Sequence, residues 1–393
     1  MRIAYISKAT NLSEKSKYAI DRRRLFALID YWVKDGCSVT QWKKGIDCDL
    51  IYIVNLPASL EETKEVFANK AKHQSVVVGM IEDFDTSVWA DINNENIDDI
   101  CELIKTNNTN HKTVKGRLKK IKNWLNHVGI IETPQSKIKK YITNSDGVIC
   151  TSELQAASLR RYNPYVSGIA DCIPEDDYKI HESSYLENLL AHKNNRIILV
   201  WEGTEWGLQL LELIRKPINN IVKKMDVQIC LRLIMPRYRP PLFNETDNKL
   251  IAEKRFLCEV ELYEWNQNTV GALISSSDIG LAPQPINNPF YKAKAYSKPL
   301  VYMVMGLPVI ASKIPSYCEL IQNNINGFIA ETDHDWETFL YYLIKDNKLR
   351  TNIGLAAKKR VNDFHSVEKV ANEIKGVFKY AVIIHKNSNA NKN

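Results

Sequence analysis

The sequence predicts an α/β protein built from two domains with parallel sheets. With 393 residues, the chain is longer than one hydrophobic core comfortably serves, so two domains of roughly 180 residues each are expected. Short apolar runs alternate with amphipathic helical segments, which is the pattern of strands buried between layers of helices. The clearest strand, helix and strand lie between residues 278 and 312.

Composition excludes several classes of protein. Charged residues at 25% and apolar residues at 45% are typical of a soluble globular protein. The eight cysteines include no CxxC pair and no Cys/His cluster at metal spacing, so we expect a reduced, cytoplasmic protein without a bound metal. The net charge of +7 favours an anionic partner, without choosing between a nucleotide, a lipid surface and a nucleic acid.

The first domain is expected to open with a buried strand at residues 2–7 and a helix at 18–34. Further strands are predicted at 50–54 and 75–81, which continues the alternation of a parallel sheet. The turn at residues 7–11 has no glycine, whereas a dinucleotide-binding turn needs several. A nicotinamide or flavin enzyme is therefore not expected.

Three carboxylates, Glu82, Asp83 and Asp85, follow the strand at 75–81. Acids this close repel one another, which favours the protonated form of at least one of them. One of the three could take a proton from a hydroxyl of a substrate, and Asp83 is the candidate for that role. The alternative is a solvated loop whose acids cap the next helix, and the choice among the three stays open.

A strongly basic segment spans residues 112–140. Its apolar residues recur at helical spacing, while Lys115, Lys119 and Lys122 lie on other faces of the predicted helix. Such a basic amphipathic helix suits an anionic membrane surface. The alternatives are a packed helix with a solvated cationic face and a nucleic-acid surface, and the latter is disfavoured because no aromatic residues interleave with the lysines.

The second domain is predicted to begin with a strand at 196–201, after a connection at 175–192. Gly203 and Thr204 follow that strand, at the edge where open α/β sheets bind their ligands. Glycine lets the backbone approach a phosphate, and threonine can donate a hydrogen bond to one. The alternative is that Gly203 serves only the turn.

Lys292, Lys294 and Lys298 lie around the start of the helix between the two clearest strands. Ser297 is predicted to cap this helix. Because the amino end of a helix already carries about half a positive charge, lysines crowded there favour a bound anion. We expect a phosphate or diphosphate held by Lys294, Lys298 and the first free N–H groups, the alternative being lysines that point into water.

Many residues in this region keep the order and spacing of a known family. They are residues 277–283, Lys294, Lys298, Tyr302, Met303, 306–312, Glu319, 326–328, Trp336, Asp346, Arg350, Gly354 and 364–366. The series resembles the donor-binding half of GT-B glycosyltransferases, in the large, mostly retaining family that uses nucleotide-sugars. Many members carry two glutamates separated by seven residues, where this chain has Ala293 and Val301, as in a lysine-rich variant of the pattern. Because of that departure, the alternative is that the chain is a non-catalytic relative with a binding or scaffold role.

The resemblance implies a GT-B fold of two Rossmann-like domains with a deep interdomain cleft. We expect an acceptor-binding domain at 1–185 and a nucleotide-sugar-binding domain at 186–365. A C-terminal helix at 366–385 would cross back to the first domain. The polar residues 386–393 predict a disordered tail.

The resemblance also implies a metal-independent glycosyltransferase without a cofactor. It would move a sugar, with retention, from a nucleoside-diphosphate sugar to a glycan or lipid-linked glycan, as in surface polysaccharide or lipopolysaccharide synthesis. The protein would be cytoplasmic, either free or peripherally bound at the inner face of the membrane. Lys294 and Lys298 would act catalytically by stabilising the leaving diphosphate, and Glu82 and Asp85 would lie on the acceptor side. The candidate donor-binding residues are Gly203, Thr204, Lys294, Tyr296, Lys298 and Glu319.

Overall fold

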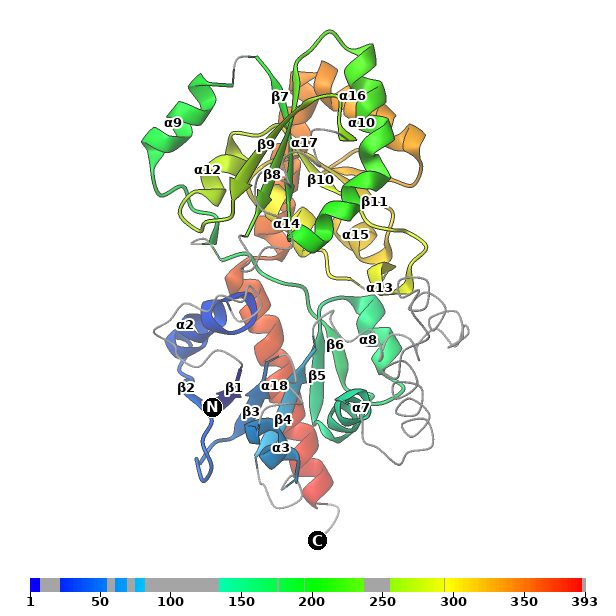
Figure 1. The fold of residues 1–393 in the computed structure, drawn as a ribbon. Coiled ribbons are helices and arrows are strands. Elements are labelled where there is room, and N and C mark those ends of the chain that lie inside the picture. The colour runs from blue at the N-terminus through cyan, green and yellow to red at the C-terminus, as the bar shows by residue number, and fades with distance from the viewer. Residues whose placement is uncertain are drawn as a thin grey trace, which may run out of the picture. The chain divides into compact units, whose positions relative to one another are not determined.

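The computed structural model describes residues 1–7, 22–54, 61–68, 75–81, 134–174, 177–193, 195–236, 255–292 and 294–390. Within these ranges the chain forms two compact units, Met1–Ala170 with Val370–Asn393, and Asp171–Lys369 (Figure 1). Each unit has a six-stranded sheet. All strand pairs of the described ranges are parallel. The predicted α/β fold with two Rossmann-like domains is confirmed.

The sheet of the first unit has the strand order β2-β1-β3-β4-β5-β6. Its inner strands are runs of apolar residues buried on both faces, as expected for parallel strands between helices. The strands are β1 (Arg2–Ile6), β2 (Ser38–Gln41), β3 (Leu50–Ile53), β4 (Val76–Met80), β5 (Gly147–Cys150) and β6 (Val166–Gly168). The helices are η1 (Arg22–Phe26), α2 (Ala27–Lys34), α3 (Glu61–Ala68), α7 (Pro134–Asn144) and α8 (Glu153–Leu159).

The C-terminal helix α18 (Val367–Ala390) packs into the core of the first unit. The ring centroid of Phe378 lies 5.2 Å from that of Trp32 on α2 and 5.1 Å from that of Tyr52 on β3. The indole Nε1 of Trp32 also donates to the carbonyl of Ala371 at 3.0 Å. The last helix of the chain therefore completes a core that the first strands begin.

The end of α18 differs from the sequence prediction. Residues 386–390 continue the helix, whereas their polar sequence predicts the start of a disordered tail. Adding a residue to an existing helix costs little, because each addition gains a hydrogen bond without a new nucleation step. The packed turns as far as Ala381, which is buried, supply that nucleus.

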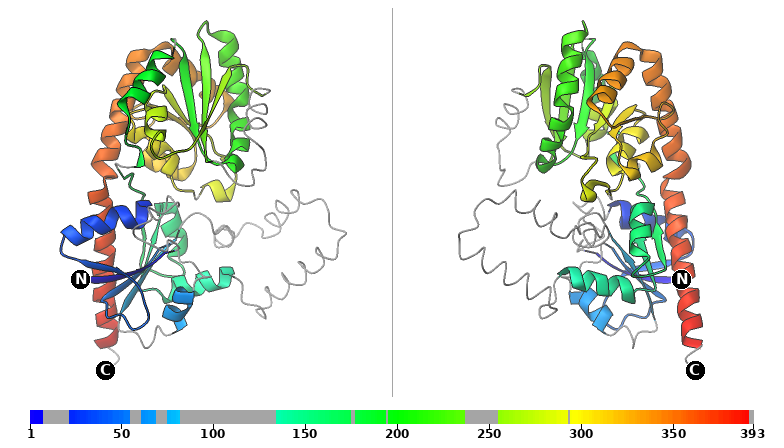
Figure 2. Two further views of the ribbon diagram at one scale, coloured as in Figure 1. Left: turned by 60° about the vertical axis from the view of Figure 1, so that its left-hand side comes forward. Right: turned by 90° about the vertical axis from the view of Figure 1, so that its right-hand side faces the viewer.

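The sheet of the second unit has the strand order β12-β11-β10-β7-β8-β9. Helices lie on both of its faces (Figure 2). The strands are β7 (Ile197–Glu202), β8 (Ile229–Met235), β9 (Glu259–Glu264), β10 (Ile279–Ala282), β11 (Val309–Ser312) and β12 (Phe328–Ala330). The helices are α9 (Ser183–Ala191), η4 (Glu205–Leu211), α10 (Glu212–Lys224), α12 (Val270–Ser275), α13 (Pro289–Lys292), α14 (Ser297–Val304), α15 (Pro315–Leu320), α16 (Asp333–Lys345) and α17 (Asn347–Phe364).

Both sheets start an inner strand with an aspartate that bonds to its neighbour. Asp146 precedes β5, and its Oδ2 accepts from the N–H of Val77 at 2.7 Å while its own N–H donates to the Val77 carbonyl at 2.8 Å. Asp278 precedes β10 and makes the same two bonds with Ile198, both at 2.8 Å. Each carboxylate extends the ladder by one bond at the amino end of the sheet and so helps to fix the register.

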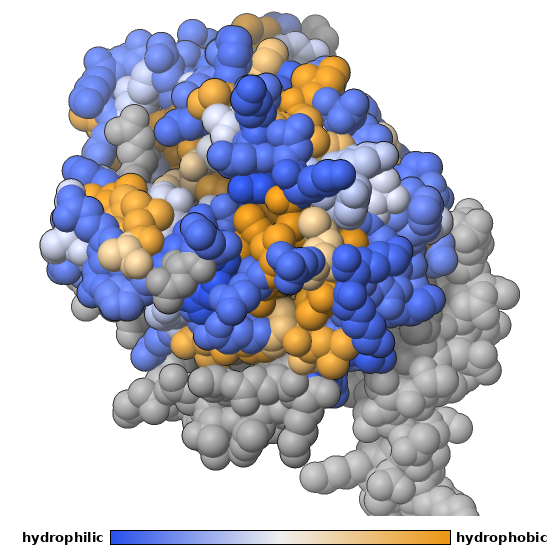
Figure 3. All heavy atoms as spheres, turned by 90° about the horizontal axis from the view of Figure 1, so that it is seen from above, coloured by the Kyte–Doolittle hydropathy of each residue, from blue (hydrophilic) through white to orange (hydrophobic). Residues whose placement is uncertain are grey.

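Few charged residues of the described ranges are buried. The face seen in Figure 3 is largely hydrophilic and is interrupted by apolar patches. An apolar patch of this kind is ordinary, since a large part of any folded surface is apolar. In the part of the chain that the structure describes, no helix combines the length and the apolar composition of a membrane span.

Candidate functional site

The candidate site lies at the carboxyl ends of the central strands of the second unit. β10, α14 and β11 form the parallel crossover that the sequence predicts. β10 pairs with β7 on one side and β11 on the other, so the carboxyl ends of all three strands meet at one edge. That edge is where open α/β sheets bind ligands.

The start of α14 differs in detail from the prediction. Its N-cap is Tyr296, which makes no side-chain capping bond. The Tyr296 ring is buried and packs edge-on against His365, with 5.5 Å between ring centroids. Ser297 is already helical, and its hydroxyl donates to the carboxylate of Asp171. The prediction that Ser297 caps the helix is wrong, because a capping residue needs a non-helical backbone.

Glycines allow α14 to lie close to its neighbours. A Cβ on Gly280 of β10 would stand 2.5 Å from the ring of Tyr302. A Cβ on Gly354 of α17 would stand 2.1 Å from the carbonyl oxygen of Gly306. Gly306 has φ of +78°, the left-handed conformation that commonly follows the end of a helix. Gly280 and Gly354 therefore have a packing role around α14, and Gly306 allows the turn that follows it.

Lys298 and Tyr302, one turn apart on α14, bind both backbone polar groups of Glu202, the last residue of β7. The Lys298 ammonium donates to the carbonyl oxygen of Glu202. The N–H of Glu202 donates to the Tyr302 hydroxyl oxygen at 2.8 Å. The ammonium also lies 4.3 Å from the ring centroid of Trp201, a cation–π contact. Lys298 is therefore fixed at the carboxyl end of β7.

The surroundings of Lys298 make its charge easy to remove. Burial, with the repulsion of Lys294, lowers the pKa of Lys298 from its ordinary 10.5 to about 7, against an opposing effect of Glu202. The Lys294 ammonium lies 5.6 Å from the ring centroid of Tyr291. An anion bound between the two lysines would favour their charged forms. The structure thus brings the two predicted lysines close enough to interact.

Gly203 lies against both Lys298 and Trp201. A Cβ at this position would stand 2.3 Å from the Trp201 ring and 3.0 Å from Nζ of Lys298. A side chain at residue 203 would therefore displace the groups that surround it. The next residue, Thr204, is exposed, and its carbonyl accepts from the N–H of Gly207 at 2.7 Å at the start of η4. Gly203, Thr204 and Lys298 come together at one strand end.

The side chain of Glu202 belongs to the same cluster, which sequence patterns did not reveal. Its Oε1 accepts from Nε1 of Trp265 at 2.7 Å. The hydroxyl of Tyr178 lies 3.1 Å and 3.3 Å from the two carboxylate oxygens. These partners are 63 and 24 residues away in sequence, so spacing could not pair them with Glu202. The available signal is an acid between a predicted strand and Gly203.

Glu319 lies in α15, and its side chain is exposed. α15 approaches the site through Tyr317, whose hydroxyl accepts from Nε2 of Gln284 at 3.2 Å. Gln284 follows β10, is buried, and donates its N–H to Oγ of Ser312 at 2.8 Å. These bonds hold the carboxyl ends of β10 and β11 together, while a role for Glu319 stays a prediction.

The acceptor-side predictions lie outside the described residues. They concern Glu82, Asp83, Asp85, Lys115, Lys119 and Lys122. Over the described ranges, no group of three or more His, Cys, Asp or Glu side chains is arranged to hold a metal ion. The part of the site that can be built from the structure is therefore the cluster around Lys298.

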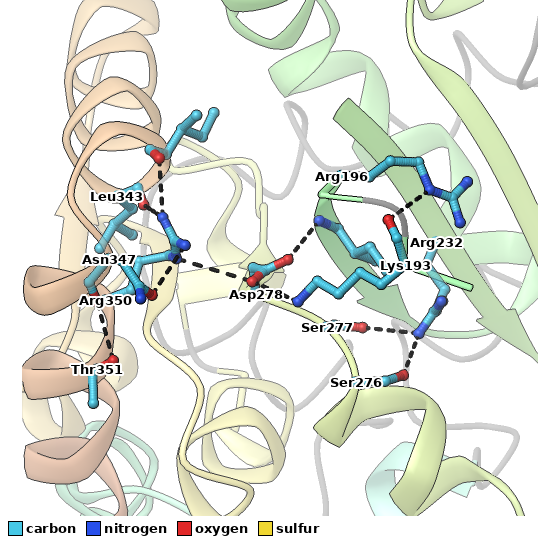
Figure 4. Close-up of polar contacts among 12 residues, drawn as sticks. Lys193, Arg196, Arg232, Ser276, Ser277, Asp278, Leu343, Asn347, Arg350 and Thr351 are labelled. Carbon is cyan, nitrogen blue, oxygen red and sulfur yellow. Dashed lines mark hydrogen bonds and ion pairs between the residues drawn. The ribbon is translucent and has the colours of Figure 1, made fainter. Parts of the chain in front are cut away.

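A second polar cluster lies at the opposite end of β10 (Figure 4). Asp278 accepts from Nζ of Lys193 at 2.8 Å, and Nε of Arg350 lies 4.0 Å from the same carboxylate. Arg350 also donates to the carbonyls of Leu343 and Ile344 at 2.6 Å and 2.9 Å. A hollow of about 710 Å³ adjoins these residues. Because the charged groups bind one another or the backbone, the cluster holds β10 against α16 and α17.

Comparison with known proteins connects the α14 region to a family. Residues 297–360 match the family model described as glycosyl transferases group 1. The match begins at the first residue of α14 and runs into α17, so it includes Lys298, Gly306 and Gly354. No curated protein matches the chain.

Solved structures are similar over nearly the whole chain. HepE from Anabaena, in complex with UDP and glucose, has a TM-score of 0.60 and 12% identity over 96% of this chain and 99% of its own. The chain has the GT-B fold. Sucrose-phosphate synthase from Thermosynechococcus elongatus has a TM-score of 0.60 and 16% identity over 96% of this chain and 98% of its own. WaaG, a glycosyltransferase involved in lipopolysaccharide biosynthesis, has a TM-score of 0.53 and 14% identity over 96% of this chain and 100% of its own.

Proposed function

We propose that this chain is a glycosyltransferase that moves a sugar from a nucleoside-diphosphate sugar to an acceptor hydroxyl. The observation that carries the proposal is the position of Lys298, a partly buried ammonium bound to the end of β7 beside Gly203. This is the ligand-binding edge of an α/β sheet. The match of residues 297–360 to group 1 glycosyl transferases supports the same function, because it includes this lysine.

The proposed mechanism is a substitution at the anomeric carbon of the donor sugar. Negative charge develops on the leaving diphosphate, and preorganised positive groups stabilise it. Lys298 and Lys294 supply that charge, and backbone N–H groups of the turn after Gly203 supply hydrogen bonds, since the N–H of Gly203 itself donates to the carbonyl of Ile234. Tyr296 and Glu319 complete the proposed donor site. The reaction is proposed to retain the anomeric configuration and to need no metal.

The proposed acceptor is a glycan or a lipid-linked glycan of a surface polysaccharide or lipopolysaccharide pathway. Support comes from the similarity in fold to WaaG, which is involved in lipopolysaccharide biosynthesis. The first unit would bind this acceptor, with Asp83 as the proton-accepting group. Glu82 and Asp85 would lie beside it. A membrane-facing surface at the cytoplasmic side would comprise Lys115, Lys119 and Lys122.

A donor screen tests the proposed function. The purified chain is first screened by thermal shift against UDP, GDP, CMP and dTDP and their sugar conjugates, since a ligand that binds the folded state raises the melting temperature. Sugar transfer from the donor so identified is then followed by mass spectrometry with glycan and lipid-linked acceptors. Binding with transfer supports the proposal. Binding without transfer or hydrolysis would instead favour a non-catalytic relative.

A further inference from the structure

Glu202 is held at every one of its polar groups. Two of its partners, Lys298 and Tyr302, come from α14 and bind its carbonyl oxygen and N–H. The other two, Trp265 and Tyr178, bind its carboxylate from the end of β9 and from the segment before α9. Glu202 therefore joins three separate parts of the second unit at the point where Lys298 is bound.

The carboxylate of Glu202 acts on Lys298 without binding it directly. The ammonium donates to the backbone carbonyl of Glu202, whereas the carboxylate oxygens accept from Trp265 and Tyr178. A direct ion pair would engage the N–H groups that an anionic ligand needs. Neutral donors hold the carboxylate aside, and its field still favours a positive charge nearby, because interactions in a partly buried site are weakly screened.

We propose that Glu202 is a positioning residue for Lys298. Its carbonyl fixes the ammonium beside Gly203, and its carboxylate, held aside by Trp265 and Tyr178, keeps that ammonium positive for an anionic group of the donor. The identity of that group as a diphosphate rests on the proposed function. The effect of Glu202 on Lys298 does not depend on the proposed function, because every contact involved lies within the protein.

The balance of charge around Lys298 makes this effect measurable. Lys294, in the loop before α14, opposes the positive charge, and Glu202, at the end of β7, favours it. The hydroxyls of Tyr302 and Tyr178 lie around the same Glu202 residue. Because the pKa of Lys298 is about 7, a change in this field alters the charged fraction near neutral pH, by about tenfold for each pKa unit once the pH exceeds the pKa.

The direct test is a titration of Lys298 in the ligand-free protein. The lysine ε-carbons are observed by ¹³C NMR, and the Lys298 signal is identified by its absence in K298R. Glu202→Gln keeps the size and the hydrogen-bond acceptor but removes the charge, so it should lower the pKa of Lys298 by about one unit. Tyr178→Phe removes a neutral hydrogen-bond donor that offsets part of the negative charge of the carboxylate. This variant should therefore raise the pKa of Lys298.

The control is Glu264→Gln, which removes an exposed carboxylate from the end of β9, two strands away from β7 in the sheet. Solvent screens such a charge, so this variant should titrate like the wild type. Circular dichroism and melting temperature verify folding. If E202Q does not fold, the opposite shift in Y178F still decides the question. An unchanged Lys298 titration in the folded variants overturns the inference.

Nucleotide binding supplies a second readout that separates this inference from the proposed function. If the wild type binds one of the screened nucleoside diphosphates, E202Q should weaken that affinity about tenfold above the pKa of Lys298, with less effect at lower pH. Tighter binding by E202Q at every pH would show that the carboxylate only repels the donor, and would overturn the inference. If no nucleotide binds the wild type, the proposed function fails, while the NMR titration still decides the role of Glu202.

Discussion

Lys298 is the residue on which the proposed chemistry depends most. Lys298→Ala removes its bond to the Glu202 carbonyl, its cation–π contact with Trp201 and its charge. If the ammonium stabilises the leaving diphosphate, kcat/KM should fall by at least ~10²-fold, the usual effect of losing one preorganised stabilising group. Lys292→Ala is the matched control, because Lys292 is an exposed lysine at the end of α13, six residues earlier in the chain. Unchanged turnover by a folded K298A would rule out this role.

The pH dependence of nucleotide affinity follows from the same residue. An ammonium must be protonated to bind a diphosphate, and the pKa of Lys298 in the free protein is about 7. A bound anion raises that pKa, so protonation and binding favour each other. Affinity should therefore be highest below the free pKa and fall as the pH rises above it.

This dependence can be measured by calorimetric titration of the nucleotide found in the donor screen. Above about pH 7 the terminal phosphate is already mostly ionised, so its own titration contributes little. Lys298→Arg stays charged throughout and should abolish the dependence in that range. The account is contradicted if the wild type and K298R show the same pH profile.

The residues of the site differ in how far the sequence could predict them. Lys298 and Gly203 can be predicted from local patterns, because one is a lysine at a helix start and the other a glycine after a strand. The role of Glu202 depends on Tyr178, Trp265 and Tyr302, which lie far away in sequence and meet it only after the strands and α14 have packed. Long-range hydrogen bonds of this kind leave no periodic signal.

At the scale of elements, the close approach of α14 to β10 is the feature most open to a stability test. Gly280→Ala would place a Cβ 2.5 Å from the Tyr302 ring. The resulting overlap should lower the free energy of unfolding by about 1–3 kcal/mol. Chemical denaturation of the purified variant measures the change.

Gly376→Ala is the matched control for this prediction. Gly376 lies in α18, and nothing in the structure comes within 4 Å of a Cβ built there. Because alanine is the better helix former, this change should raise the free energy of unfolding by about 0.5–1 kcal/mol. Equal destabilisation by both substitutions would mean that contact with Tyr302 is not the cause.

The crossover helix was predicted well because its boundaries have local causes. An apolar strand precedes it and Gly306 ends it, while α14 begins at Ser297, one residue earlier than the predicted cap allows. The first helix was predicted less well. The sequence favours one helix over residues 18–34, whereas the described part contains a π-helical turn, Arg22–Phe26, that leads into α2, Ala27–Lys34. Apolar spacing marks the buried face of such a segment but does not distinguish these two hydrogen-bond patterns.

At the scale of the whole molecule, the first unit depends on the last helix of the chain. Phe378 of α18 is buried between Trp32 and Tyr52. Phe378→Ala should therefore lower the free energy of unfolding by about 3–5 kcal/mol, the usual effect of truncating a buried aromatic side chain. Tyr380→Ala, at an exposed position of the same helix, should change it by less than about 1 kcal/mol. Comparable effects of the two changes in denaturation curves would argue against a core role for α18.

The division into two sheets could be predicted from chain length and from alternating apolar runs, because both are properties of the whole sequence. That α18 packs into the first unit was expected from family resemblance alone. Its own apolar residues indicate a buried face but do not identify the surface that covers it. Asp146 and Asp278 precede their strands and bond to the neighbouring strand. This role likewise becomes evident only once the strand order is known.

The central claim is that the carboxyl edge of the second sheet binds the diphosphate of a sugar nucleotide. A crystal structure with the nucleotide identified by the donor screen tests it most directly. We predict that the diphosphate lies against Nζ of Lys298 and the backbone of Gly203. A nucleotide found instead in the hollow beside Asp278 and Arg350, with no phosphate near Lys298, would contradict the account.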